Sequence, residues 1–173
     1  MTNASLQQIL NSITIIIDTR EHSEGNSANI IAYLDSKGIK HVQRCLKFGD
    51  YSFEVDGQSY ENKIAIERKA NLTEVSGNLA QNRERFENEF QRAKDAGAKL
   101  ILMVENGSYQ EIIEHKYRTN LAEKSFLASL FAFQYRYGLD IQFVSSKYSG
   151  MFIHSQFYYF LREILKNAEG ETA

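Results

Sequence analysis

The feature that most constrains the fold of this chain is the run Ile13-Thr14-Ile15-Ile16-Ile17, in which every residue is β-branched. Such a run predicts a central strand covered on both faces, because a strand with one solvated face would alternate apolar and polar residues. The residues at 99–105 form a second, largely apolar run of strand length. The chain must therefore supply helices for both faces of a sheet.

The remaining elements follow from periodicity and from Gly, Asn, Asp and Ser, since the chain contains no proline. Further strands are expected at 40–46, 51–55, 59–69 and 139–144. Helices are expected at 5–10, 27–37, 71–78, 83–96, 108–115, 122–137 and 151–166. Strands that alternate with helices predict an α/β fold, in which a mixed central sheet begins as a meander and is flanked by helices.

Size, charge and cysteine content limit the classes of protein to consider. The 173 residues suit one domain, with its core at about 13–165 and a polar tail at 167–173. No apolar run approaches the roughly 20 residues that span a bilayer, and the polar start is no signal peptide. A single cysteine, Cys45, excludes an internal disulfide and fits a reducing cytoplasm. With a net charge of −2, any nucleic-acid binding requires a local basic patch.

The strand at 59–69 ends in a pattern that indicates chemistry. Its period of two sends Ile64, Ile66 and Arg68 to one face, and Ala65, Glu67 and Lys69 to the other. An acid and a lysine thus lie side by side, and Asp50 precedes them by one hairpin. The plain alternative is a solvated ion pair between Glu67 and Lys69, which would contribute little.

Two carboxylates and a lysine in this layout suit metal-dependent phosphodiester hydrolysis. A hard divalent cation takes oxygen ligands and activates water, and Asp50, Glu67 and the carbonyl oxygen of Arg68 could supply those ligands. Lys69 would orient or deprotonate the water and stabilise developing negative charge. Asp18 follows the central strand at the end where sites in open α/β sheets collect.

Three segments together resemble a known family. Asp18-Thr19-Arg20-Glu21, Gly49-Asp50 and Glu67-Arg68-Lys69 match in order and spacing the XPF-type structure-specific nuclease domain, whose motif is GD…ERKxxxD. The segments 82–86, 104–106 and 124–127 resemble its short bacterial and phage versions, and the resemblance spans about 13–165. It implies a restriction-endonuclease-like core, Mg²⁺ or Mn²⁺ as cofactor, DNA as substrate, and the cytoplasm of a bacterial or phage-infected cell.

The resemblance also implies roles for individual residues. Asp18, Asp50 and Glu67 would be metal ligands, together with the carbonyl oxygen of Arg68. Lys69 would activate water, and Arg20 and Glu21 would support the site.

The chain departs from the family at the last acid of the motif. That position holds Thr73, and the acid Glu74 is one residue further along. Glu74 either replaces the missing acid or caps a helix that begins after Asn71. Both interpretations remain open at this point.

Arg68 points away from Glu67 and Lys69 on the strand. A buried arginine needs a partner, so we expect a carboxylate contact that holds the strand in place, with Glu21 and Glu89 as the candidates.

Contacts with DNA phosphates require cations near the acids, and the candidates are Lys47, Arg83, Arg85, Lys116 and Arg118. Arg83 and Arg85 diverge by about 200° on a helix, so only one of them can face the phosphates. Arg83, nearer the helix N-terminus, is expected on the substrate side. Alternatively, most of these charges form a solvated face.

The helices at 122–137 and 151–166 carry aromatic residues around most of their circumference. One small domain has difficulty covering them on all sides, so they predict either a thick aromatic core or an interface. The resemblance to the XPF-type family implies that this interface is a two-fold homodimer through these helices. The tandem helix-hairpin-helix module common in the family is not expected here, so a separate protein would target the chain to DNA, or its selectivity would be looser.

Taken together, these features predict a divalent-metal-dependent DNA endonuclease acting on branched, flapped or gapped DNA. The alternative is a non-catalytic DNA-binding or scaffold subunit that retains the nuclease fold. A role in repair, recombination or phage replication is not distinguished by the residues.

Overall fold

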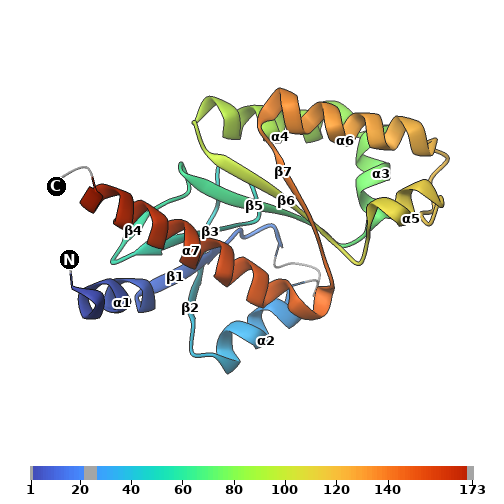
Figure 1. Ribbon diagram of the computed structural model, residues 1–173. Helices are drawn as coiled ribbons and strands as arrows, with labels where there is room; N and C mark the ends of the chain where they lie inside the picture. The colour runs from blue at the N-terminus through green and yellow to red at the C-terminus, as the bar shows by residue number, and fades with distance from the viewer. Residues whose placement is uncertain (1, 22–26, 171–173) are drawn as a thin grey trace.

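The structure is a computed structural model that describes residues 2–21 and 27–170 (Figure 1). Within these residues, seven strands form one mixed sheet in the order β2-β1-β3-β5-β6-β7, and β4 pairs with β3. The strands are β1 (Ile13–Ile17), β2 (Lys40–Gln43), β3 (Tyr51–Val55), β4 (Gln58–Ser59), β5 (Ile64–Lys69), β6 (Lys99–Glu105) and β7 (Asp140–Val144). The predicted α/β class with a mixed sheet is confirmed.

Helices cover both faces of the sheet, as the apolar runs in β1 and β6 require (Figure 1). One layer contains α1 (Asn3–Asn11), α2 (Ala28–Ser36) and α7 (Ser149–Gly170), which pack on the sheet face that carries Ile15, Ile17 and Ile101. The other contains α3 (Leu72–Gln81), α4 (Arg83–Asp95), α5 (Tyr109–Ile113) and α6 (Glu123–Tyr137). A 3-10 turn, η2 (Ser146–Tyr148), leads from β7 into α7.

The topology at the start of the sheet differs from the expected meander. The crossover through α2 returns the chain parallel to β1, so β2 pairs with β1. β3 then pairs antiparallel with the other side of β1, with Ile17 opposite Tyr51. β1 is therefore a central strand between β2 and β3, and its C-terminal end lies beside the start of β3.

The expected strand at 59–69 is interrupted. β4 ends at Ser59, and the amides of Lys63 and Ile64 both donate to the carbonyl oxygen of Tyr60, which closes a turn. The Tyr60 ring stacks on Phe53 at 4.6 Å between centroids, and this contact stabilises the turn. The expected strand at 40–46 also ends early, at Gln43, because Leu46 donates its amide to the carboxylate of Asp18 instead.

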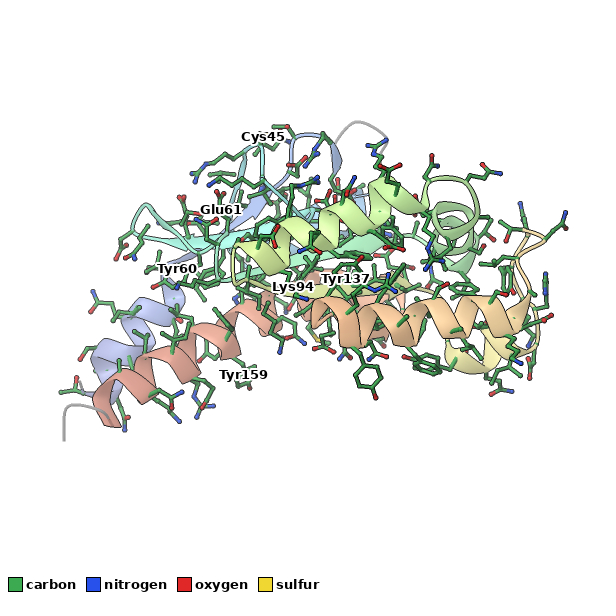
Figure 2. All side chains as sticks on the ribbon, turned by 90° about the horizontal axis from the view of Figure 1, so that it is seen from above. Cys45, Tyr60, Glu61, Lys94, Tyr137 and Tyr159 are labelled. Atoms are coloured by element: carbon green, nitrogen blue, oxygen red, sulfur yellow. The ribbon has the colours of Figure 1, made fainter. Side chains whose placement is uncertain are left out.

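The two aromatic helices lie on opposite faces of the sheet. Their inner sides are core: Phe126, Leu130 and Phe133 of α6, and Ile153, Phe157 and Leu161 of α7. Tyr159 points away from α7 into solvent, whereas Tyr137 and Lys94 lie where α4 and α6 meet (Figure 2). The predicted interface through both helices is thus divided into two separate surfaces. No described helix is long and apolar enough to cross a bilayer.

Candidate active site

The acids of the sequence motif meet at one edge of the sheet, where β1, β5 and β6 end and β3 begins. A cavity of about 270 Å³ opens there. It is lined by Arg20, Asp50, Glu67, Lys69, Glu74, Asn78, Asn82, Arg85, Phe86 and Glu89. Most of these side chains are polar or charged, as is typical of a site for a charged substrate.

The end of β5 supplies two of the lining side chains. Ile64 and Ile66 belong to the cluster under α2 and α7, whereas Ala65 packs toward α3 to α6, so the predicted alternation is confirmed. Glu67 and Lys69 follow on the Ala65 face and line the cavity. The Lys69 Nζ lies 2.8 Å from the Glu67 Oε1 and 5.3 Å from the centre of the Phe86 ring.

Gly49 places Asp50 against the end of β5. The backbone of Gly49 has a φ of +72°, and a Cβ there would lie 2.9 Å from the Cβ of Ala65 and 3.1 Å from the carbonyl oxygen of Ile66. Only glycine fits such a close approach without strain. The amide of Asp50 then donates to Ile66 at 2.8 Å, and the amide of Arg68 donates to the Asp50 Oδ2 at 2.7 Å.

The two carboxylates and the lysine of the cavity perturb one another electrostatically. Burial, followed by the negative charges of Glu67 and Glu21, raises the pKa of Asp50 well above its ordinary value. Burial also raises the pKa of Glu67, although the Lys69 ammonium opposes the shift. Burial alone would lower the pKa of Lys69, but Glu67 and Asp50 outweigh it and raise that pKa. The Lys69 ammonium is therefore stabilised by the two carboxylates, which suits it to orienting water and stabilising negative charge.

Asp18 lies beside Asp50, since its amide donates to the carbonyl oxygen of Asp50 at 2.7 Å, but its side chain does not line the cavity. Its Oδ1 accepts from the amide and the Nε of Arg20, and its Oδ2 accepts from the Nη2 of Arg20 and the amide of Leu46. Burial would raise the pKa of Asp18, but these hydrogen bonds hold it below its ordinary value. The side chain is fully buried, and its visible effect is to hold Arg20 at the cavity wall.

The residues present fit a hydrated divalent cation rather than a protein cage. Across 2–21 and 27–170, no three His, Cys, Asp or Glu side chains form a group that could hold a metal ion. The cavity nevertheless presents two carboxylates with raised pKa values, the half-buried Asp50 and the buried Glu67, whose repulsion a cation would relieve. Mg²⁺ is commonly held by one or two carboxylates, several waters and the phosphates of a substrate.

Glu74 lies both at the start of α3 and at the border of the cavity. The Asn71 Oδ1 accepts from the amide of Glu74 at 2.9 Å, and the Glu74 Oε2 accepts from the amide of Ala70 at 2.8 Å. Asn71 is thus the N-cap of α3, whereas the Glu74 carboxylate binds the amide of the residue before the N-cap, one position earlier than in a capping box. The other carboxylate oxygen lies 3.5 Å from the Lys69 Nζ, so Glu74 also borders the cavity.

Arg68 is buried with carboxylate partners, as expected. Its Nη1 donates to the Glu21 Oε1 at 2.8 Å and its Nη2 to the Glu105 Oε2 at 2.6 Å. Of the two candidates, Glu21 is confirmed and Glu89 is wrong, because Glu89 lies across the sheet and accepts from the amide of Gly49 at 2.8 Å. Burial is the main cause that raises the pKa of Glu21, against the opposing charge of Arg68.

The arginine that lines the cavity is not the one expected from the sequence. Arg85, not Arg83, lines the cavity. The Arg83 guanidinium instead donates to Glu87 at 2.6 Å and to the Ser129 Oγ at 3.0 Å, and it lies over the Phe133 ring. Helix packing therefore holds Arg83 against α6. The other three candidates, Lys47, Lys116 and Arg118, are exposed and lie outside the cavity.

Sequence reasoning missed several lining residues of α4 and its N-terminal boundary. Asn82 and Glu89 lie at helical spacing from the candidate Arg85, so the period of 3.6 residues could have placed them on the same face as that residue. From the sequence, Glu105 has no expected role beyond its place in the resembling segment 104–106. Its carboxylate meets Arg68 across 37 residues of chain, and no local pattern indicates that contact.

Comparisons with known proteins show a similar fold and identify the family. XPF from Aeropyrum pernix has a similar fold, with a TM-score of 0.62, 20% identity, and coverage of 83% of this chain and 59% of that chain. XPF from the same organism in complex with DNA gives a TM-score of 0.64 at 20% identity, covering 87% and 66% of the two chains. The chain thus spans less than two thirds of either solved protein. No curated protein sequence matches. The ERCC4 domain family matches residues 17–155, and the chain therefore belongs to this family of XPF-type nuclease domains.

Proposed function

We propose that this protein is a divalent-metal-dependent DNA endonuclease that hydrolyses phosphodiester bonds in branched, flapped or gapped DNA. The observation that carries the proposal is the convergence of Asp50, Glu67 and Lys69 on one polar cavity at the sheet edge. Membership of the ERCC4 domain family supports it. The similar fold of XPF in complex with DNA supports DNA as the ligand class.

In this proposal the two carboxylates of the cavity and a backbone oxygen would hold the cation. Asp50 and Glu67 are the side-chain ligands, and the carbonyl oxygen of Arg68, between Glu67 and Lys69 in the chain, is the third. When bound, Mg²⁺ or Mn²⁺ would polarise the phosphate and lower the pKa of an attacking water. The Lys69 ammonium orients that water and stabilises the negative charge that develops on the phosphate.

Arg20 is proposed to contact a substrate phosphate. Asp18 holds its guanidinium by bonds of 2.7 and 3.1 Å, and 57% of the Arg20 side chain remains exposed beside the cavity. An arginine fixed in this way presents a planar donor group to a phosphate at little further cost in entropy. Asp18 then acts through Arg20 rather than as a metal ligand. Glu21 is a supporting residue that holds Arg68.

Arg85 is the favoured DNA contact, because it lines the cavity and pairs with no carboxylate within the described residues. We propose outer phosphate contacts for Lys47, Lys116 and Arg118. Arg83 is the least favoured DNA contact, because its bond to Ser129 holds its guanidinium against α6. With few cations involved, we expect modest affinity that falls steeply as salt concentration rises.

We also propose a homodimer, now restricted to the α5 and α6 surface. Ile113, Phe131 and Tyr135 are exposed there at 62%, 46% and 92%, and an apolar surface of this kind suits a second copy of the chain. A monomer at micromolar concentration in light scattering would reject the dimer. The proposed location is the cytoplasm of a bacterial or phage-infected cell.

The experiment that tests the function is cleavage of labelled fork, flap, gapped and plain duplex DNA with Mg²⁺ or Mn²⁺. The intact protein is compared with Asp50→Ala and Lys69→Ala. We expect cleavage by the intact protein and its loss in both variants. Retained cleavage in both variants would reject the assigned site. Binding without cleavage by the intact protein would favour a scaffold subunit.

A further inference from the structure

A buried ionic network lies behind the proposed active site, on the opposite face of the sheet. Its centre is Arg68, which is 7% exposed and whose two terminal nitrogens bond to Glu21 and Glu105. The Nε of Arg68 is buried and has no hydrogen-bond partner among the described residues. The position of the guanidinium therefore depends on those two carboxylates.

Glu105 is in turn held by the first residue of α7. The Ser149 hydroxyl donates to the Glu105 Oε1 at 2.5 Å, and both residues are buried, with exposures of 0% and 3%. The carboxylate also lies at the N-terminus of a 22-residue helix, where the helix dipole favours a negative charge. Each Glu105 oxygen thus has one partner, Ser149 for one and Arg68 for the other.

The start of α7 is itself fixed by a close contact with α2. A Cβ on Gly150 would lie 2.8 Å from the Cβ of Tyr33 and 2.9 Å from two of its ring atoms. The absence of a side chain at Gly150 lets the helix start approach Tyr33, which places the Ser149 hydroxyl at Glu105. A continuous set of contacts therefore runs from α2 through α7 and Glu105 to Arg68.

Resting on the proposed function, we infer that Glu105 and Ser149 are positioning residues for the active site. Arg68 lies between Glu67 and Lys69, and its amide donates to the carboxylate of Asp50 at 2.7 Å. The bonds to the Arg68 side chain, on the face opposite the cavity, fix the C-terminal end of β5, from which Glu67 and Lys69 project into the cavity. Replacing Glu105 removes one of the two carboxylate partners of the buried Arg68 guanidinium, and replacing Ser149 removes the hydrogen bond that holds Glu105. In either variant the C-terminal end of β5 becomes more mobile.

The test compares the intact protein with Glu105→Gln, Ser149→Ala and Gly150→Ala. Ser76→Ala is the matched control, since Ser76 is equally buried but bonds only to the carbonyl oxygen of Thr73 in its own helix, at 3.0 Å. Three quantities are measured: kcat and KM for DNA cleavage, Mn²⁺ affinity by calorimetry, and hydrogen exchange of the amides of Arg68 and Lys69.

We expect Glu105→Gln and Ser149→Ala to lower kcat and Mn²⁺ affinity by about 10-fold, with KM for DNA unchanged. Both should speed exchange of the Arg68 amide, with Gly150→Ala acting in the same direction and Ser76→Ala without effect. If Glu105→Gln does not fold, Ser149→Ala, which deletes a single hydroxyl, decides the matter.

The outcomes separate this inference from the proposed function. If the intact protein cleaves DNA and the network variants behave like Ser76→Ala in all three measurements, the positioning role is wrong and the function stands. If the intact protein neither cleaves DNA nor binds Mn²⁺, the function is wrong. In that case unchanged amide exchange in Ser149→Ala would overturn the positioning role as well, and faster exchange would retain it.

Discussion

The amide of Arg68 donates a 2.7 Å hydrogen bond to the carboxylate of Asp50, and this bond joins two segments that are 18 residues apart in the chain. It orients Asp50 toward the strand end that carries Glu67 and Lys69. The Arg68 side chain meanwhile extends to the other face and bonds to Glu21 and Glu105. One residue therefore connects the cavity to the structure behind it through both its backbone and its side chain.

Replacing Asp50 with Asn should stabilise the metal-free protein at neutral pH while abolishing cleavage. A carboxyl whose folded pKa is raised contributes stability that is fully present below its ordinary pKa of 3.8 and is lost as pH rises through the folded value. Asn does not ionise and so does not lose this stability as pH rises. We therefore expect the free energy of unfolding at pH 7 to increase by about 1 kcal/mol or more. Thermal unfolding in EDTA at pH 4 and pH 7 measures it. A gain equal at both pH values would contradict the electrostatic explanation.

Asp18→Asn should have the opposite pH dependence. The pKa of Asp18 is lowered, so its stabilisation is present above pH 3.8 and is lost as pH falls through the folded value. The variant should lose about 1–3 kcal/mol at pH 7, because an amide cannot accept all four hydrogen bonds. Denaturant titrations at successively lower pH, starting from pH 7, should show the free energies of unfolding of the intact protein and of Asp18→Asn converge. A constant difference at every pH would argue against a stabilising carboxylate.

Divalent ions should raise the melting temperature of the intact protein. Binding to the folded state alone adds about 2.7 kcal/mol at an ion concentration 100 times the Kd. Relief of the repulsion between Asp50 and Glu67 is the physical reason. Differential scanning calorimetry with Mn²⁺ measures the shift, and Glu67→Gln should abolish most of it. An equal shift in that variant would place the ion elsewhere.

Gly49→Ala should destabilise the protein by at least about 1 kcal/mol, because the backbone has a positive φ and the new methyl group would contact Ala65 at 2.9 Å. The resulting shift would also displace Asp50 and reduce cleavage. Gly57→Ala is a useful control, since Gly57 has a φ of +83° but no atom within 4 Å of an added Cβ. Equal losses in both variants would attribute the effect to φ alone.

Arg85→Gln should weaken DNA binding across all sequences and reduce the slope of log K against log salt by about one. Arg83→Gln is the paired control, because its guanidinium is engaged with Glu87 and Ser129. The control should reduce thermal stability and leave the salt slope unchanged. Fluorescence anisotropy at several salt concentrations measures both. A change of slope with Arg83→Gln alone would restore the assignment made from the sequence.

The sequence by itself determined those features that depend on local periodicity. The β-branched run at 13–17 specified a central strand, and the period of two in β5 sent Glu67 and Lys69 to one face and Arg68 to the other. The spacing of the motif also indicated Asp50 as a candidate residue of the same site. These predictions hold because a side chain's direction relative to its own strand is set by the backbone alone.

Only the tertiary structure decided which groups meet. The amide of Leu46, 28 residues away, donates to an oxygen of Asp18, whose side chain does not line the cavity. Glu105 reaches Arg68 because β6 lies beside β5, and contact with Ser129 of α6 turns Arg83 away, so Arg85 lines the cavity. Such pairings depend on strand order and helix packing, because a buried charge pairs with whichever carboxylate or amide the fold brings within hydrogen-bond distance.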